Sequence, residues 1–380
     1  MALPRHAEIA GAGFAGLAAA IALRQRGWSV RVHEMSEELR AFGAGIFIWE
    51  NGLRVLAALG AYVEVMQGAH EAITYETRRN GHSITACSFT PAQGTRMLTM
   101  TRQHLYSALL RAANREGVDL VTSSRAIGAT AQGELIVAGG RKLKADLVIG
   151  ADGVGSRVRD SLGLLQERNV YSDGIVRVLA PRLQDELGPG NWDHVIDFWS
   201  STGERPLRIL YVPCSERDLY LAMMAPVADR EATALPLRTD IWIVAFPQLA
   251  PVIRRLSASA RYDAYETTKL FRWSAGRVAI VGDAAHAMTP TLGQGAGLAM
   301  ANALALAVAL EGQPSMELAL GEWEARERPL TEHTQDCSAQ IANERRLSRW
   351  DAITLRAANH VPTGTEHLGP LIEPITAGGQ

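Results

Sequence analysis

The chain contains few cysteines and few aromatic residues, three and 6% respectively among 380 residues. Cys87, Cys214 and Cys337 are odd in number, far apart and without the spacing of metal ligands. A disulfide framework, a metal site and a redox-active cysteine pair are therefore not expected. We expect reduced thiols in a cytoplasmic protein.

Excess charge and long apolar runs are also missing. The formal net charge is −2 and no basic block occurs, so nucleic acid is not an expected partner. The longest apolar helix, about Gly297 to Leu310, is shorter than the roughly 20 residues that span a bilayer, and no signal peptide or membrane contact is expected. A small molecule is the expected partner, and the sequence leaves monomer and homo-oligomer undetermined.

A glycine-rich turn near the start predicts a dinucleotide site. The apolar strand Ala7–Ala10 leads into Gly11, Gly13 and Gly16, and the helix Leu17–Gln25 follows. In this order the glycines permit a tight turn, close approach of a pyrophosphate and close packing of the helix on the strand. Loops rich in small residues also produce this spacing by chance, so the motif alone is weak evidence.

Three acidic residues at strand ends extend this prediction. Glu34 follows a second apolar strand about 20 residues on, where a carboxylate can accept the ribose hydroxyls. Asp152 and Asp283 end the apolar strands Leu147–Gly150 and Val278–Val281. Such aspartates can hold the ribityl chain of FAD, which NAD lacks, but each can equally form a turn or cap a helix.

Together these motifs resemble a known family. Gly11-x-Gly-x-x-Gly16, Asp152-Gly153 and Gly282-Asp283-Ala-Ala-His286 with Pro290 are similar, in order and separation, to the single-component FAD-dependent aromatic hydroxylases over essentially the whole chain. The resemblance implies an α/β fold like that of para-hydroxybenzoate hydroxylase. Its parts are a discontinuous Rossmann-like FAD-binding domain, a substrate domain with a mixed or antiparallel sheet, and C-terminal helices.

The domain boundaries follow from changes in the hydrophobic pattern. Alternating runs such as Val195–Trp199 and Leu207–Val212 indicate the substrate sheet, with Gly81 as a turn. We expect residues 1–70, 101–160 and 273–310 to bind FAD, residues 71–100 and 170–272 to form the substrate domain, residues 311–358 to be helical, and residues 359–380 to form an extended tail.

The resemblance also implies which residues contact the cofactor. Arg40 to Ile46 looks like the segment that passes the FAD, Arg102 like the flavin-contacting arginine, and Gly293–Gly297 like the backbone donors beside the flavin pyrimidine. The expected FAD-binding residues are Gly11, Gly13, Phe14, Ala15, Gly16, Glu34, Met35, Arg40, Gly45, Arg102, Asp152, Asp283, Gly295, Ala296 and Gly297. A second strand-linked nucleotide motif is absent from the sequence, which disfavours disulfide reductases and leaves the choice between NADH and NADPH open.

The chemistry implied by the resemblance is carried by the flavin. NADH or NADPH reduces FAD, O2 forms a flavin C4a-hydroperoxide, and this hydroxylates an electron-rich ring. Catalysis by an acid–base residue is not expected, and His286 is interpreted as structural. A flavin oxidase or reductase without oxygen insertion, and a flavin-loaded sensor, remain alternatives.

Five shorter segments resemble the oxygenases of 3-hydroxypyridine carboxylates, and they include Thr74–Thr77, Arg208–Tyr211 and Tyr265–Leu270. The match implies a substrate site made of Tyr75, Arg208, Tyr220, Tyr265 and Pro290, in which the arginine fork binds a ring carboxylate. Taken singly, each tyrosine is better explained by core packing with one satisfied hydroxyl, and the alternative for Arg208 is a surface strand position. Arg177 and Arg182 are weaker candidates. A 3-hydroxypyridine carboxylate with ring opening is the expected substrate, and a hydroxybenzoate that is only hydroxylated is the alternative.

Overall fold

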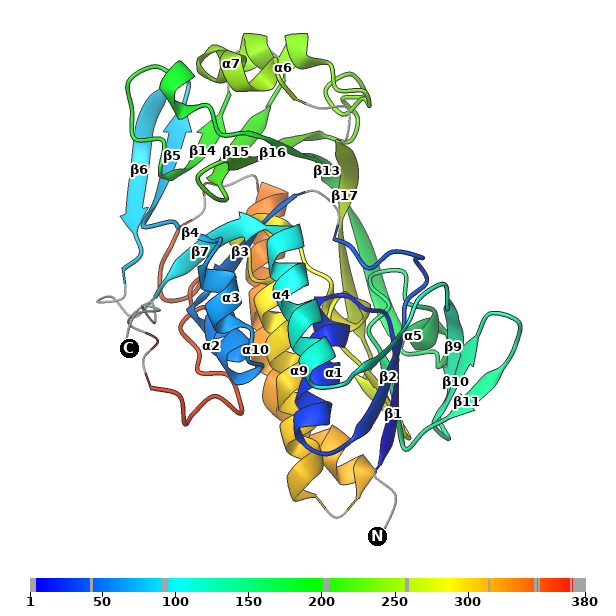
Figure 1. Ribbon diagram of the computed structural model, residues 1–380. Coiled ribbons are helices and arrows are strands. Elements are labelled where there is room, and N and C mark those ends of the chain that lie inside the picture. Colours follow the sequence, from blue (N-terminus) through cyan, green and yellow to red (C-terminus); the bar gives the residue numbers. More distant parts are fainter. Residues whose placement is uncertain are drawn as a thin grey trace.

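The computed structural model describes residues 5–41, 44–90, 95–200, 205–256, 260–313, 315–344, 347, 349–369 and 371. Figure 1 shows a lower part, in which helices cover a parallel sheet, and an upper part, in which a larger sheet is roofed by α6 and α7. Segments far apart in the sequence form both parts. The expected α/β class with a Rossmann-like part, a mixed sheet and C-terminal helices is confirmed.

The lower sheet has six strands in the order β18-β19-β12-β1-β2-β8, and all neighbours are parallel except β18 and β19. Its central strands are short and apolar because both faces are covered. In the order just given, the strands are Ser274–Ala275, Val278–Ile280, Leu147–Gly150, His6–Ala10, Ser29–His33 and Asp119–Val121.

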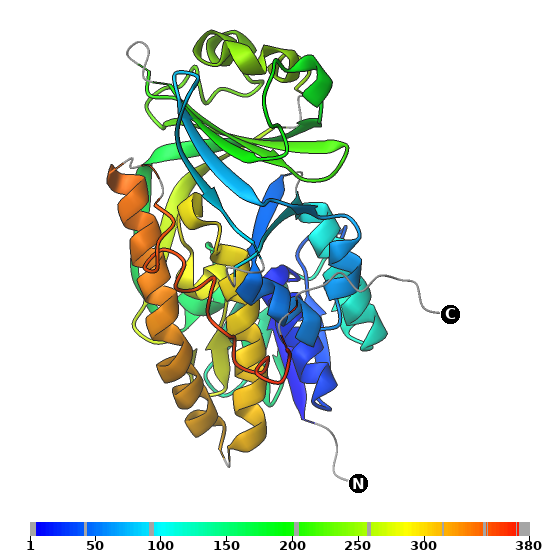
Figure 2. The same ribbon diagram turned by 90° about the vertical axis from the view of Figure 1, so that its left-hand side faces the viewer.

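Helices α1 (Phe14–Gln25), α4 (Arg102–Arg115) and α9 (Gly295–Gly312) cover this sheet, and α10 (Met316–Glu344) lies along α9 (Figures 1 and 2). Smaller elements complete this part of the protein: α2 (Glu50–Ala58), α3 (Tyr62–Met66), α5 (Arg157–Ser161), α8 (Asp283–His286), the sheet β3 (Gly45–Trp49), β7 (Met97–Thr101) and β4 (His70–Glu71), and the sheet β9 (Ala126–Thr130), β10 (Glu134–Val137) and β11 (Lys142–Lys144). Within the described residues, no helix is both long enough and apolar enough to cross a membrane.

The upper sheet has seven strands in the order β17-β13-β16-β15-β14-β5-β6, with a single parallel pair, β14 and β5. The strands, in that order, are Arg261–Leu270, Leu165–Pro181, Asp218–Pro226, Arg208–Pro213, Val195–Trp199, Thr74–Arg79 and His82–Ser88. The tight connection between β5 and β6 contains Gly81 in a left-handed conformation, as expected. We propose from these pairings that β5 and β6 belong with residues 170–272 as one substrate domain.

Alternation along the strands separates the two faces of the upper sheet. Outward-facing residues such as Val176 and Ile209 pack with Trp242 and Phe246, beneath α6 (Thr239–Ala245) and α7 (Ala250–Ile253). Inward-facing residues form a separate cluster with parts of β3 and β7. Every second residue of β13 to β17 therefore faces the nucleotide-binding part.

The C-terminal part differs from the expectation of a helix to Ala358. Helix α10 ends at Glu344, and residues 351–359 form turns. The described residues beyond Ala358 also differ from the expected extended tail, because Thr365 is buried and Arg54 donates to the Leu368 carbonyl. Proline, glycine and threonine prevent a helix here, but they do not prevent packing. Residues 370 and 372–380 of the expected tail lie outside the described residues.

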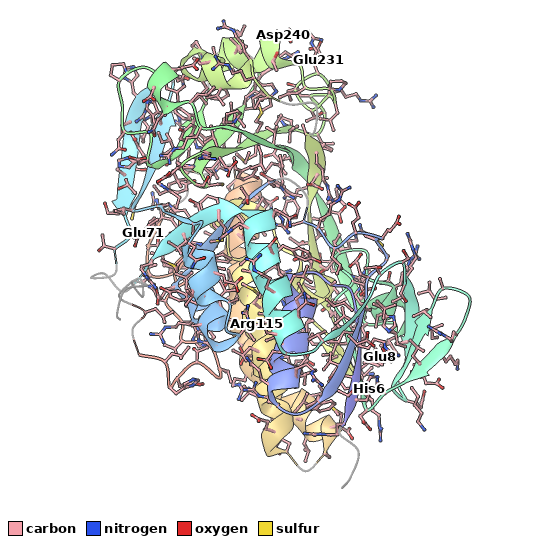
Figure 3. The ribbon with its side chains drawn as sticks, viewed as in Figure 1. His6, Glu8, Glu71, Arg115, Glu231 and Asp240 are labelled. Atoms are coloured by element: carbon pink, nitrogen blue, oxygen red, sulfur yellow. The ribbon has the colours of Figure 1, made fainter. Side chains whose placement is uncertain are left out.

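A polar cluster lies inside the lower sheet. Glu8 on β1 is buried, and its carboxylate contacts His33 Nε2 at 2.6 Å and His6 Nε2 at 3.0 Å. Figure 3 shows Glu8 and His6 on β1, far from Glu231 and Asp240 at the opposite end of the molecule. Burial raises the pKa of Glu8, but the hydrogen bonds from the two histidines outweigh it and hold this pKa below its ordinary value.

Candidate functional site

Two adjoining cavities lie between the lower part and the inner face of the upper sheet. The larger has a volume of about 650 Å³ and the smaller about 340 Å³. Both are lined by Gly13, Phe14, Arg102, Arg177, Tyr265, Asp283, Met288 and Pro290. These shared residues make the two cavities parts of one site.

The glycine turn opens into this site. Gly11 has a φ of +97°, and a Cβ there would lie 2.4 Å from the Ala151 carbonyl oxygen. A Cβ on Gly16 would lie 2.0 Å from the Gly11 oxygen, whereas one on Gly13 would meet nothing within 4 Å. Gly11 and Gly16 are thus required by packing, and Gly13 leaves open space at the N-terminus of α1. A helix N-terminus with such space is suited to a pyrophosphate.

Glu34 is held in place at the edge of the larger cavity. Its Oε2 accepts a hydrogen bond from Ala12 N at 3.0 Å, and its Oε1 accepts one from Ser36 N at 2.9 Å. Each carboxylate oxygen can accept a further hydrogen bond. The geometry is suited to a diol such as an adenosine ribose.

Arg102 supplies a positive charge to both cavities. Thr101 caps α4 by accepting a hydrogen bond from His104 N at 3.1 Å, and the Arg102 guanidinium lies 4.9 Å from the centre of the Phe14 ring. Within the part of the chain that is described, Arg102 makes no ion pair with a carboxylate. Burial lowers its pKa. Such a partly desolvated guanidinium favours an electron-rich or anionic ligand.

The two strand-end aspartates behave differently. Asp283 is surrounded by protein but remains accessible, because it faces both cavities, and burial raises its pKa against the opposing effect of Arg102. Asp152 lines neither cavity. Its carboxylate accepts hydrogen bonds from Ser156 Oγ and, at 2.7 Å, from Arg157 N at the start of α5. In the structure, Asp152 therefore binds the first N–H groups of α5, which agrees with the helix-capping alternative to a role in holding the ribityl chain.

One wall of the smaller cavity comes from β15, β16 and β17. Arg208, Tyr220 and Tyr265 lie on the inner face and line the smaller cavity, with Pro290 opposite in the loop after α8. Tyr220 packs closely on β3, since a Cβ on Gly45 would lie 2.6 Å from its ring. This contact explains why a glycine begins β3.

Arg208 does not point to the outer surface of the sheet, which was the alternative interpretation of its place in the sequence. Its Nε and Nη2 donate to the two oxygens of Asp197 at 2.6 Å and 2.9 Å, and the buried Tyr75 side chain lies near both groups. The edge of the guanidinium that was expected to clamp a substrate carboxylate is therefore occupied by Asp197.

Most of the expected residues meet at this site. Those that line a cavity are Gly13, Phe14, Ala15, Glu34, Arg40, Gly45, Arg102, Asp283, Gly295 and Ala296, together with Arg208, Tyr220, Tyr265 and Pro290. Those that line neither are Gly11, Gly16, Met35, Asp152, Gly297 and Tyr75. Met35 is 61% exposed, and Gly297 packs near Asn51.

Two residues contribute more to the site than the sequence predicted. Arg177, a weak candidate, lines both cavities and binds Asp263 at 2.8 Å, whereas Arg182 lines neither. Asp197 was missed, although an aspartate within the apolar strand Val195–Trp199 signals that a buried charge needs a partner.

Hydrogen bonds from α10 hold the loop that carries Pro290. Gln335 on α10 donates from Nε2 to the carbonyl oxygens of Ala287, at 2.6 Å, and Thr268, at 2.8 Å. His286 contacts Asn302 at 3.0 Å and lines neither cavity, and burial lowers its pKa to about 4. These contacts agree with a structural role for His286.

The residues present fit FAD. The open space at Gly13, the fixed carboxylate of Glu34 and the unpaired Arg102 provide sites for phosphates, ribose and an electron-rich ring system, and the loop Gly293–Gly297 leads into the start of α9. These groups lie one after another along the two adjoining cavities.

Comparison with known proteins agrees with this fit. A family model described as an FAD binding domain matches residues 6–318. A putative 2-heptyl-3-hydroxy-4(1H)-quinolone synthase of Rhodococcus erythropolis is 44% identical over 93% of this chain and 92% of its own length. An FAD-dependent urate hydroxylase of Klebsiella pneumoniae is 29% identical over 84% of this chain and 85% of its own.

Among solved structures, 2-methyl-3-hydroxypyridine-5-carboxylic acid oxygenase superimposes with a TM-score of 0.91 and 49% identity, covering 95% of this chain and 98% of that chain. That structure is of a tetrameric form. The family match, the relatives and the two-cavity site lead to one conclusion: the chain belongs to the FAD-binding family of single-component aromatic monooxygenases.

Proposed function

We propose that the protein consumes NAD(P)H and O2 and hydroxylates a small hydroxylated aromatic acid, with a 3-hydroxypyridine carboxylate as the first candidate and ring opening as the following step. The observation that carries the proposal is the 340 Å³ cavity beside the cofactor cavity, with Arg208, Tyr220 and Tyr265 in its wall. The 49% identity to an oxygenase of this substrate class supports it.

In this proposal the sequence-predicted cofactor residues hold FAD, with the helix α1 turn at the pyrophosphate, Glu34 at the ribose, and Arg102 and Asp283 toward the isoalloxazine side. Asp152 contributes through the turn that it stabilises at α5. Bound FAD supplies the activation of O2 and the transfer of an oxygen atom.

Residues of the chain bind the aromatic ring of the substrate and exclude water from it. Burial raises the pKa of Tyr220 and of Tyr265, so both hydroxyls stay protonated and can donate hydrogen bonds to ring substituents. Ile175, Leu210 and Met224 provide an apolar surface between these polar groups. Exclusion of water protects the reactive oxygen species from unproductive decay.

The same apolar surface favours a second candidate, 3-hydroxylation of an alkylquinolone, the reaction suggested by the name of the 44% identical relative. An alkyl chain could pack on Ile175, Leu210, Ala222 and Met224. It would leave the polar groups of the same wall, Arg208, Tyr220 and Tyr265, without partners, which costs binding energy.

A substrate panel tests the proposal. The FAD-loaded protein is assayed for NADH and NADPH oxidation with hydroxypyridine carboxylates, hydroxybenzoates and a 2-alkyl-4-quinolone. We expect the hydroxypyridine carboxylates to stimulate oxidation most. Product mass separates hydroxylation, which adds one oxygen atom, from ring opening, which adds two oxygen and two hydrogen atoms. Stimulation without oxygen-18 from O2 in the product would identify an oxidase or reductase, and no stimulation by any compound would refute the proposal.

A further inference from the structure

Asp197 is a fully buried carboxylate, with an exposed fraction of 0%, and it pairs with Arg208, which lines the smaller cavity. It lies on β14, whose residues Val195, Asp197 and Trp199 alternate toward the inner face of the sheet. A buried carboxylate is costly unless it is paired and fully hydrogen-bonded. Its partners therefore define what this end of the cavity presents to a ligand.

Two side chains donate hydrogen bonds to Asp197. Arg208 binds both oxygens, and Trp199 Nε1 donates to Oδ2 at 2.8 Å. The buried Tyr75 side chain lies near both Asp197 and Arg208. The Trp199 ring also lies 4.7 Å from the Arg208 guanidinium carbon. This arrangement holds the guanidinium in one orientation.

Strand register produces the arrangement. Trp199 on β14 is directly opposite Arg208 on β15, and Asp197 is two residues from Trp199 on the same face. The ion pair is therefore diagonal across two neighbouring strands, a separation that long side chains span. Burial lowers the pKa of Arg208, but Asp197 outweighs this effect and the pKa is raised. Arg208 stays protonated, and its charge is balanced by Asp197.

The consequence concerns the charge of the ligand. The Nε–Nη2 edge of Arg208 binds Asp197, whereas Nη1 has no hydrogen bond among the described residues, and Arg208 lines the smaller cavity. This end of the site thus offers a directed N–H donor without net charge. A donor of this kind suits an uncharged acceptor, such as a ring nitrogen or hydroxyl oxygen, and gives little preference for an anion.

We propose that Asp197 is a specificity-determining residue: by balancing the charge of Arg208, it makes this end of the cavity bind an uncharged acceptor of the aromatic substrate and not its carboxylate. The inference rests on the proposed function and deepens it. Removing the negative charge would turn Arg208 into an anion site.

The test measures charge preference by binding, not by turnover. The FAD-loaded protein is titrated by calorimetry with 5-hydroxynicotinate and with its uncharged analogue 5-hydroxynicotinamide. In Asp197→Asn we expect the preference for the acid over the amide to rise about tenfold or more, because a nearby charge is no longer balanced. A purely structural role would weaken both ligands alike.

A second variant covers the case in which Asp197→Asn does not fold, because it leaves a buried charge unpaired. Asp197→Asn combined with Arg208→Gln replaces one neutral pair with another. Its ratio of acid to amide affinity should stay within about threefold of the wild type. A fall of tenfold or more in this ratio would show that the charge of Arg208 binds the acid, and would overturn the inference.

The outcomes separate this inference from the proposed function. Failure of the wild-type protein to bind either compound overturns both. Binding by the wild type with an unchanged ratio in Asp197→Asn overturns the inference alone and leaves the proposed function standing.

Discussion

Alanine substitutions at two glycines of the same turn should have different effects: Gly16→Ala should lower stability, and Gly13→Ala should weaken FAD binding. At Gly16 the added Cβ would lie 2.0 Å from the Gly11 oxygen and 3.1 Å from the Gly11 carbonyl carbon. Helix α1 must therefore move away from the turn by roughly 1 Å, in an interior that is close-packed. At Gly13, which has an ordinary φ of −72°, a Cβ meets nothing within 4 Å. Gly13→Ala is thus a matched control for the effect of packing.

The magnitudes follow from these contacts. Overpacking costs about 1–3 kcal/mol, and alanine recovers about 0.5–1 kcal/mol as a better residue than glycine inside a helix. Gly16→Ala should lower the stability of the FAD-free protein by about 1–2 kcal/mol. With roughly 2–4 °C per kcal/mol in a large domain, its melting midpoint should fall by about 2–8 °C. Gly13→Ala should change this midpoint by about 1 °C.

FAD binding should show a different pattern. The methyl group of Gly13→Ala would enter the space proposed for the phosphates, and we expect at least about tenfold weaker FAD binding, equivalent to about 1.4 kcal/mol. Melting of the FAD-free proteins by circular dichroism and FAD titration by fluorescence quenching measure the two effects. Equal losses of midpoint in both variants, or unchanged FAD affinity in Gly13→Ala, would refute the assignment of roles.

Two further predictions concern buried polar contacts. Gln335→Leu removes the side-chain donor to the carbonyls of Thr268 and Ala287, of which Ala287 keeps the hydrogen bond from Thr268 N at 3.2 Å, so we expect a loss of about 1–3 kcal/mol, reduced where water enters. An unchanged denaturation midpoint would contradict the role of Gln335 in holding this loop. The pKa of Glu8 is lowered in the folded state, so its ionised form stabilises the fold above its ordinary value of 4.5, and this stabilisation is lost as the pH falls through the lower folded value. Glu8→Gln should therefore be less stable than the wild type at pH 7, with a gap that narrows below about pH 4.5 in urea titrations; a gap that widens on acidification would contradict the hydrogen-bonded carboxylate.

The nucleotide-binding frame could be predicted because its signals are local. The strand, turn and helix around Gly11–Gly16 are contiguous, and apolar runs such as Leu147–Gly150 identify strands covered on both faces. The ends of the C-terminal elements were less predictable. A composition rich in proline and glycine excluded a helix beyond Ala358, but the sequence revealed neither the turns before Ala358 nor the burial of Thr365.

The candidate site was predictable residue by residue only where a motif names the residue. Asp152 and Asp283 both follow an apolar strand and look alike in sequence, yet Asp152 caps α5 and Asp283 faces the cavities. The difference arises from the direction in which the chain leaves each strand, which is set by tertiary packing. Arg177 was underestimated for the same reason, because its neighbours Asp263 and Tyr220 come from other strands.

Arg208 illustrates why the substrate is harder to predict than the cofactor. An arginine in a pocket suggests an anion, and from sequence the inference is reasonable. Its charge in the folded protein, however, is a property of the pair, because Asp197 lies within 2.6 Å and both are screened from water. One residue on a neighbouring strand can therefore reverse which ligand the same arginine prefers, while the FAD-binding frame stays unchanged. The charge balance of such a pair across strands therefore has to be considered before an arginine in a pocket is assigned to a substrate group.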